Sequence, residues 1–225
     1  PIAALADGGT LVIGVEADQS KIDYSQNPSL QGTNTATLIN EGLLIPDENN
    51  QPAAALAESW EVSPDATRIT FNLRKGVTFH DGSAFTASDV VWNIEHHKTT
   101  EGALFGPIFN QMIASVETPD DHTVVLNLTQ PSASFIGTFA DRYDCMFVTQ
   151  APESFDADGN FITAIGTGPF KLSEWVQGDS LTLVKNDSYW NADLPKVDEL
   201  VMRVIPDPSS RLNALRSGDI HITRK

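Results

Sequence analysis

Short runs of alternating apolar and polar residues predict three β-hairpins. In each, two runs of strand-forming residues flank a turn that contains Pro, Asp or Gly, and Ile69, Phe71 and Leu73 show the alternation most clearly. This two-residue period is typical of strands that bury one face. The runs predicted to pair are residues 58–62 with 68–73, 115–118 with 123–128, and 170–176 with 180–185. A large part of the chain is therefore expected to form antiparallel sheet.

Helical spacing and capping residues predict helices between these hairpins. Thr86 stands three residues ahead of Asp89, which is a variant of the capping box, and Val90, Val91 and Ile94 follow on one side of the helix. Further helices are predicted at residues 33–40, 108–113, 131–140 and 207–218.

Three apolar runs outside the hairpins are predicted to be further strands, at residues 10–15, 146–148 and 200–205. The order strand, helix, strand between residues 200 and 222 indicates a right-handed parallel crossover. Antiparallel hairpins and a parallel crossover together predict an α/β fold with a mixed sheet.

Composition indicates a globular protein of one or two compact units. Of the 225 residues, 40% are hydrophobic and 20% are charged. The formal net charge of −16 argues against nucleic acid or an anionic membrane surface as a direct partner, because phosphate binding needs clustered cations. We expect this charge to reflect an acidic exported protein or a protein adapted to salt.

The cysteine count and the hydropathy of the chain limit the disulfides, metal sites and membrane spans that it can form. A single cysteine, Cys145, excludes an intrachain disulfide and a multi-cysteine zinc site. The chain has no apolar run of the roughly 20 residues that a membrane span needs, so no direct membrane insertion is expected. Ala4 and Ala6 fit the cleavage pattern of a signal peptide, although a disordered N-terminus explains these first residues equally well.

The polar residues form no known catalytic or metal-binding sequence motif. His96 and His97 are adjacent on a predicted helix and point about 100° apart, so we expect a solvated surface pair rather than a chelating pair. Residues 156–160 resemble a calcium loop but lack its glycine and glutamate positions, which favours an ordinary turn. No cofactor and no metal are expected. A ligand-binding protein and a hydrolase or metalloprotein with a dispersed site both stay open from the residues alone.

Several separated blocks of the sequence carry a resemblance to a known family. Residues 56–91 (LAESWEVSPDATRITFNLRKGVTFHDGSAFTASDVV) are followed by GTGPFKL at 166–172, NDSYW at 186–190 and RVIPDP at 203–208. In this order they resemble the peptide/nickel type of bacterial solute-binding proteins, the extracytoplasmic receptors of ABC importers. The resemblance extends over roughly residues 10 to 222.

The resemblance implies a periplasmic-binding-protein-like lobe with a mixed β-sheet and an inserted, hairpin-rich α+β subdomain. We expect an N-terminal tail at residues 1–9, a main lobe at 10–46 and 166–225, and the inserted subdomain at 47–165. Full receptors of this type are much longer and close two lobes over the solute. The second lobe is expected to be absent from this chain, which favours a fragment.

The implied function is capture of a small solute for the importer's membrane permease, without catalysis. A di- or oligopeptide is the default cargo, and a nickel chelate, an opine or a sugar is the alternative within the family. The resemblance also implies a periplasmic or extracellular location and a monomer when full length.

Ligand contacts are expected, by position in the family, from three loops. These are the loop ahead of the first helix, the segment after the Asp89 helix, and the stretch before the strand at 146–148. The residues are Pro28, Ser29, Leu30, Gln31, Gly32, Leu104, Phe105, Gly106, Arg142, Tyr143 and Asp144. Arg142 can pair with a ligand carboxylate, or equally with Asp141 or Asp144.

Overall fold

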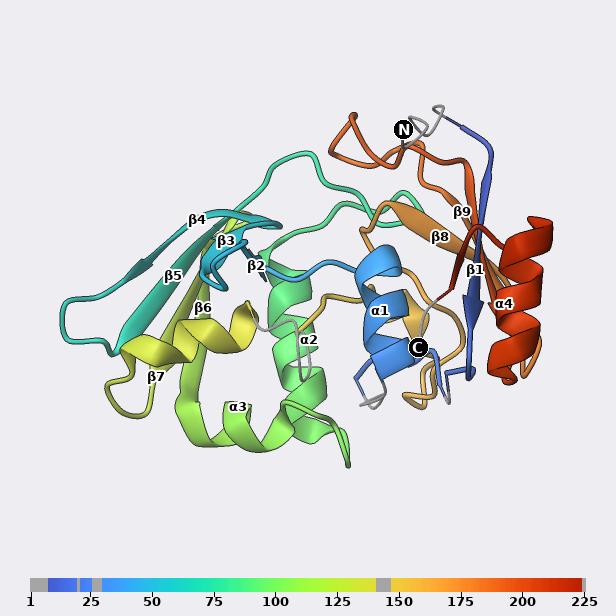
Figure 1. Ribbon diagram of the computed structural model, residues 1–225. Coiled ribbons are helices and arrows are strands. Elements are labelled where there is room, and N and C mark those ends of the chain that lie inside the picture. Colours follow the sequence, from blue (N-terminus) through green and yellow to red (C-terminus); the bar gives the residue numbers. More distant parts are fainter. Residues whose placement is uncertain (1–7, 20, 26–29, 141–146, 224–225) are drawn as a thin grey trace.

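The computed structural model of the chain describes residues 8–19, 21–25, 30–140 and 147–223 (Figure 1). One sheet joins strands from both ends of the chain, and its order is β11-β1-β10-β9-β8. Its strands are β1 (Thr10–Val15), β8 (Phe170–Val176), β9 (Ser180–Lys185), β10 (Glu199–Val204) and β11 (Ile222–Thr223).

This sheet is mixed, as predicted. Strand β1 pairs in parallel with both β10 and β11, with Leu11 opposite Leu200 and Ile13 opposite Ile222. Strand β9 is antiparallel to both β10 and β8. Strands β1, β8, β10 and β11 therefore run in one direction. Helix α4 (Pro208–Ser217) makes the predicted crossover from β10 to β11.

The second sheet contains the first two predicted hairpins. Its antiparallel order is β4-β5-β7-β6, built from β4 (Ala57–Val62), β5 (Arg68–Leu73), β6 (Ile113–Asp120) and β7 (Thr123–Leu128). Helices α2 (Ala87–Thr99) and α3 (Gly106–Met112) lie against it (Figure 1). A two-stranded ribbon of β2 (Leu44–Pro46) and β3 (Pro52–Ala54) completes this part. The capping box of α2 is confirmed, because the backbone N–H of Thr86 donates to the Asp89 carboxylate at 2.7 Å.

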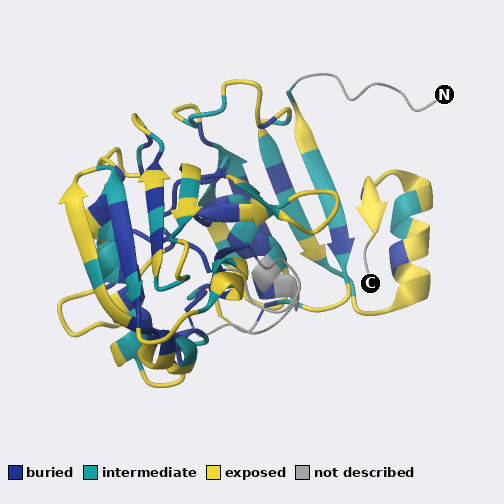
Figure 2. Cartoon of the chain, turned by 90° about the vertical axis from the view of Figure 1, so that its left-hand side faces the viewer, coloured by how far each residue is buried: buried dark blue, intermediate teal, exposed yellow. Residues whose placement is uncertain are grey.

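Buried apolar side chains form two clusters. Figure 2 marks the buried residues along the chain. One cluster lies under the β4–β7 sheet and centres on four fully buried aromatic rings, Phe71, Phe109, Phe139 and Phe147. The other lies between α1 (Leu30–Ile39) and the mixed sheet. Helix α4 contributes little to either, since Leu212 is 45% exposed and Arg211 is the buried residue on this helix. The division into a main lobe and an inserted subdomain stays a prediction.

Two glycines let the end of α1 touch the start of β8. The backbone N–H of Gly168 donates to the Ile39 carbonyl at 2.9 Å. A Cβ atom on Gly166 would lie 2.1 Å from that same carbonyl oxygen. Only glycine permits so close an approach, so the GTGPF block holds the helix against the sheet.

Glu41 joins the same region through its carboxylate. This buried group accepts hydrogen bonds from the Tyr189 hydroxyl at 2.8 Å, the Trp190 indole at 2.9 Å and the Thr167 hydroxyl at 3.0 Å. Burial raises the pKa of Glu41, and the three hydrogen bonds oppose that rise. These hydrogen bonds connect the segment after α1 to the segment that contains Thr167 and to residues 189–190.

Three secondary-structure predictions need correction. Helix α1 begins at Leu30 rather than at Thr33. The α-helix expected at 131–140 is a 3₁₀ helix, Ala133–Phe139, in a stretch of serine, glycine and β-branched residues that favour an α-helix weakly. The strand expected at 146–148 is wrong for Phe147 and Val148, whose side chains enter the two different clusters. Met146 lies outside the described residues.

The prediction of a solvated histidine pair is also wrong. His97 is only 4% exposed, and its ring lies 5.4 Å from that of Phe105 and 5.6 Å from that of Phe147. His96 is half-buried and stacks on Trp92 at 4.8 Å. His97 is therefore a buried residue of the core, and His96 is partly covered.

Stability should fall on mild acidification because two histidines are held neutral. Burial lowers the pKa of His97 to about 3 and that of His80 to about 4. The unfolded chain titrates near 6.5, so below that pH it binds protons that the native state excludes. Each histidine should therefore remove about 2 kcal/mol from the free energy of unfolding between pH 7 and pH 5.

Urea denaturation of the wild type and His97→Phe at both pH values measures this effect. Phenylalanine suits the aromatic surroundings, and the variant should lose about 2 kcal/mol less than the wild type on acidification. Equal losses in the two proteins would contradict the burial of a neutral His97.

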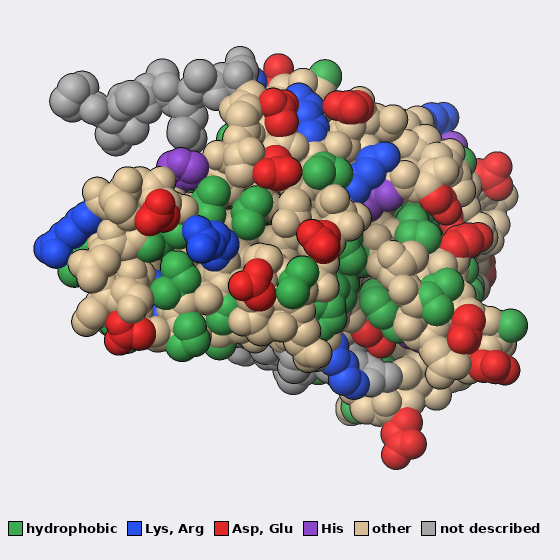
Figure 3. Space-filling view, turned by 90° about the vertical axis from the view of Figure 1, so that its right-hand side faces the viewer, with side chains coloured by type: hydrophobic (Ala, Val, Ile, Leu, Met, Phe, Trp, Pro, Cys, Tyr) green, Lys and Arg blue, Asp and Glu red, His purple; other side chains and the backbone are tan. Residues whose placement is uncertain are grey.

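Figure 3 shows the surface on the side of α4. On the described part of this face, acidic side chains are scattered among basic ones, and the basic side chains form no continuous patch. This distribution agrees with the net charge of −16.

Candidate functional site

The carboxyl ends of β1, β8, β10 and β11 meet at one edge of the mixed sheet, which we call the carboxyl edge. In open α/β sheets, ligands bind outside this edge. The chain leaves β1 here, and the first turn of α1 lies on the same side, as does the turn after α2 (Figure 1). The topology alone therefore makes the carboxyl edge the candidate site.

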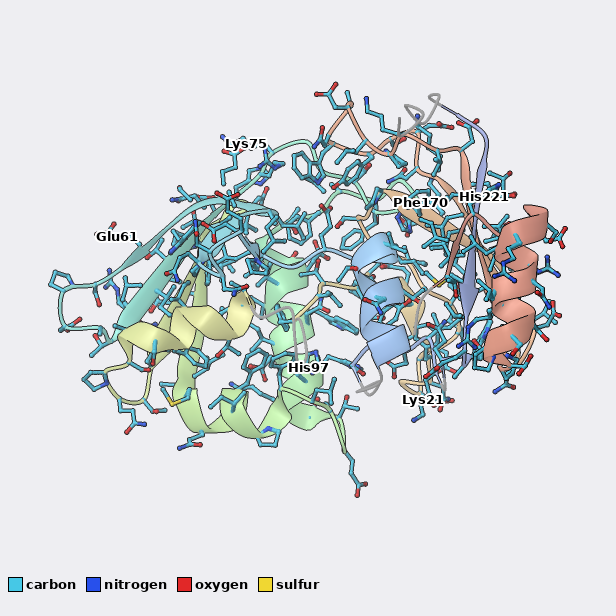
Figure 4. All side chains as sticks on the ribbon, in the orientation of Figure 1. Lys21, Glu61, Lys75, His97, Phe170 and His221 are labelled. Atoms are coloured by element: carbon cyan, nitrogen blue, oxygen red, sulfur yellow. The ribbon has the colours of Figure 1, made fainter. Side chains whose placement is uncertain are left out.

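A hollow of about 720 Å³ lies at this edge, a size in the range of small-molecule sites. Lys21, at its rim, lies at the opposite end of the sheet from Phe170 (Figure 4). Three segments form the walls, and their lining residues are Lys21, Ile22, Asp23, Gly159, Asn160, Phe161, Ile162, Thr163, Leu172, Trp175 and Gln177. The walls mix polar and apolar side chains, and Lys21 and Asp23 contribute one cation and one carboxylate.

Hydrogen bonds hold the walls in place. The Asp23 carboxylate accepts from the Ser25 backbone N–H at 3.0 Å and from the Ser25 hydroxyl at 2.7 Å. The Ser25 carbonyl in turn accepts from the Leu104 N–H at 3.0 Å. The wall segment at residues 21–25 is therefore linked through Ser25 to Leu104, in the segment after α2 that was expected to contact ligand.

The structure places the residues predicted to bind ligand as follows. Leu30, Gln31 and Gly32 lie in the first turn of α1, so the expectation that they form a loop ahead of the helix is wrong. Their position at the carboxyl edge suits the predicted contact. Pro28, Ser29, Arg142, Tyr143 and Asp144 lie outside the described residues.

The segment after α2 has a mixed role. Leu104 is half-buried beside Ser25. Phe105 points into the aromatic cluster, and a Cβ atom on Gly106 would lie 2.5 Å from the His97 carbonyl oxygen. Both residues are thus required by packing, and their contact with ligand stays a prediction.

Sequence reasoning did not find Asp18, Lys21, Asp23 or Trp175. The Asp18 carboxylate accepts from the Trp175 indole at 3.0 Å and from the Gly178 N–H at 2.8 Å. The rule that polar residues after a parallel strand gather at its carboxyl edge gave a signal for the first three. Trp175 carried no such signal, because 157 residues separate it from Asp18.

The described residues offer little for catalysis. They contain no group of three or more His, Cys, Asp or Glu side chains placed to hold a metal ion. The Thr100 hydroxyl lies 3.4 Å from His96 Nδ1, beyond the distance expected of a nucleophile and its base. Burial lowers the pKa of His96 as well. The arrangement can enclose and orient a molecule.

Sequence comparison identifies related proteins. The family model of the bacterial extracellular solute-binding proteins, family 5 (middle region), matches residues 51–225. The chain is 32% identical over 220 residues to the glutathione-binding protein GsiB of Pectobacterium atrosepticum. The aligned region covers 97% of this chain and 42% of GsiB.

Solved structures with the same fold include two binding proteins in complex with ligand. AgaA from A. tumefaciens R10, in complex with agropinic acid, has a TM-score of 0.84 and 34% identity over 94% of this chain and 43% of AgaA. DppA from Helicobacter pylori, in complex with the peptide STSA, has a TM-score of 0.83 and 29% identity over 96% of this chain and 46% of DppA. The chain thus spans less than half the length of these relatives.

The length and apolar character of a helix decide whether it can cross a membrane. Among the residues that the structure describes, no helix combines the length and apolar character needed to cross a bilayer.

Proposed function

The chain belongs to the bacterial extracellular solute-binding proteins of family 5, and from this premise we propose that it forms one wall of a cleft that captures a small solute for an ABC importer. Its relatives are substrate-binding proteins and not enzymes, as the resemblance in the sequence implied. The observation that carries the proposal is the hollow at the carboxyl edge. There, segments far apart in sequence meet where ligands bind in open α/β sheets.

A di- or oligopeptide is the proposed solute. The walls combine apolar and aromatic surface with Lys21 and Asp23, which suits a molecule that carries both charges and an apolar side chain. The relatives point the same way, since one is named for glutathione and another holds a peptide. An opine is the second candidate, because AgaA, at 34% identity, holds agropinic acid.

The remaining parts of the proposal follow from the family. The protein would be exported and would deliver its solute to the importer's membrane permease after two lobes close. It would act as a monomer when full length.

Mass spectrometry of small molecules that co-purify with the full-length protein tests this function. We expect a peptide, and calorimetry with that peptide should then give saturable binding at one site. Hydrolysis of added peptides or esters by the purified protein, or purification without any small molecule followed by no binding, would contradict the proposal.

The 225-residue chain by itself should bind such a solute weakly or not at all. A single wall leaves most of the solute in water, whereas effective sites bury most of the ligand surface. Titration calorimetry with glutathione and with short peptides checks this expectation. A dissociation constant below about 1 μM would show that one wall suffices.

A further inference from the structure

Asp18 lies next to the hollow at the carboxyl edge and accepts several hydrogen bonds. It lies three residues after the end of β1, and its half-buried carboxylate accepts from three N–H groups. The donors are Trp175 Nε1 at 3.0 Å, the Gly178 backbone at 2.8 Å and the Gln19 backbone at 2.8 Å. Bonds to a charged acceptor are stronger than those between neutral groups.

These hydrogen bonds connect two walls of the hollow. One wall is residues 21–23, which follow Asp18 in the chain. The other is Leu172, Trp175 and Gln177, on and just after β8. Because the Asp18 side chain is short, its bonds to Trp175 and Gly178 fix how far apart the two walls stand.

Asp18 does not itself line the hollow. Three donors already occupy its oxygens, so little acceptor capacity faces a ligand. Any influence on a bound molecule must therefore act through Trp175, whose ring forms part of the wall, and through the segment that carries Lys21 and Asp23.

We infer that Asp18 is a positioning residue for the solute: it orients the Trp175 indole and sets the width of the hollow at the carboxyl edge. The inference rests on the proposed function. A positional error of about 1 Å in such a wall is enough to weaken a site whose contacts must converge.

Two variants test the role of the carboxylate. Asp18→Asn keeps the size of the side chain, but its amide nitrogen would face an N–H donor and lose at least one of the hydrogen bonds. Trp175→Phe keeps an aromatic side chain in the wall and removes the indole donor, together with part of the ring surface. Asp179→Asn is the matched control. Asp179 follows Gly178 in the turn between β8 and β9, and its exposed carboxylate accepts a hydrogen bond from the Ser180 hydroxyl and none from Trp175 or Gly178.

The first measurement needs no ligand. In ¹⁵N-labelled full-length protein, Trp175→Phe identifies the indole resonance of Trp175. We expect this resonance to shift in Asp18→Asn and to stay in place in Asp179→Asn. An unmoved resonance in Asp18→Asn would overturn the inference.

The second measurement is calorimetry of full-length protein with glutathione, the peptide STSA and agropinic acid as probes. For the probe that binds the wild type, Asp18→Asn should weaken binding by tenfold or more, and Asp179→Asn should leave it unchanged. In the double variant Asp18→Asn/Trp175→Phe, the loss of binding free energy should be smaller than the sum of the losses in the two single variants, since both changes break one link.

The outcomes separate the two proposals. A shifted indole resonance with unchanged affinity would make Asp18 purely structural and overturn the inference, while the proposed function stands. A wild-type protein that binds none of the three probes would refute the proposed solute class and the inference with it.

Discussion

Replacing Gly166 with alanine should lower the free energy of unfolding by about 3 kcal/mol. The added Cβ would lie 2.1 Å from the Ile39 carbonyl oxygen and 2.4 Å from Asn40 Oδ1. The Ile39 carbonyl already accepts the Gly168 N–H at 2.9 Å, so neither backbone can move without breaking that bond. The end of α1 would have to leave the mixed sheet. Urea denaturation measures the loss.

Gly137→Ala is the matched control. No neighbouring atom lies within 4 Å of the place that a Cβ atom on Gly137 would occupy, and the backbone conformation there suits any residue. Its replacement should change the free energy of unfolding by less than about 1 kcal/mol. If the two variants lose the same amount, the close approach at Gly166 does not hold the helix to the sheet.

Glu41→Ala should cost about 3–5 kcal/mol of the free energy of unfolding. Removal of the carboxylate leaves the donors of Thr167, Tyr189 and Trp190 without their acceptor in a largely buried place. An unmet buried donor costs about 1–3 kcal/mol. Glu41→Gln, which keeps one acceptor oxygen, should lose less. Thermal and urea unfolding of the two variants give the comparison.

Glu58→Ala controls for the loss of any glutamate. This exposed side chain lies 3.6 Å from Arg74 in a surface ion pair, and its removal should cost less than about 1 kcal/mol. A Glu41→Ala variant as stable as Glu58→Ala would show that water replaces the lost acceptor at Glu41.

The hairpins, the α2 capping box and the crossover through α4 were predictable, because each depends on residues close together in sequence. The periplasmic-binding-protein-like α/β fold is confirmed by the match to AgaA and DppA. The burial of His97 was not predictable from α2 alone. It depends on Phe105 and Phe147, and the latter is 50 positions along the chain, on a segment without regular structure.

The candidate site was predictable in outline only. The resemblance directed attention to residues 28–32 and 104–106, and the hydrogen bond from Leu104 to Ser25 joins the second segment to the chain just before the first. The wall that contains Trp175 was missed, because β10 and β9 lie between β1 and β8 in the sheet, and only the segment after β1 brings Asp18 to Trp175. Long-range pairing of this kind leaves no local pattern in the sequence.

Hydrogen exchange of the full-length protein, followed by mass spectrometry with and without its bound solute, tests the central claim most directly. If the carboxyl edge holds the solute, exchange should slow in peptides that cover residues 16–25, 30–32 and 104–106 and in the wall at 172–177. Exchange in the β4–β5 and β6–β7 hairpin turns should not change. Slower exchange confined to those turns, with the carboxyl edge unchanged at saturating solute, would contradict the account.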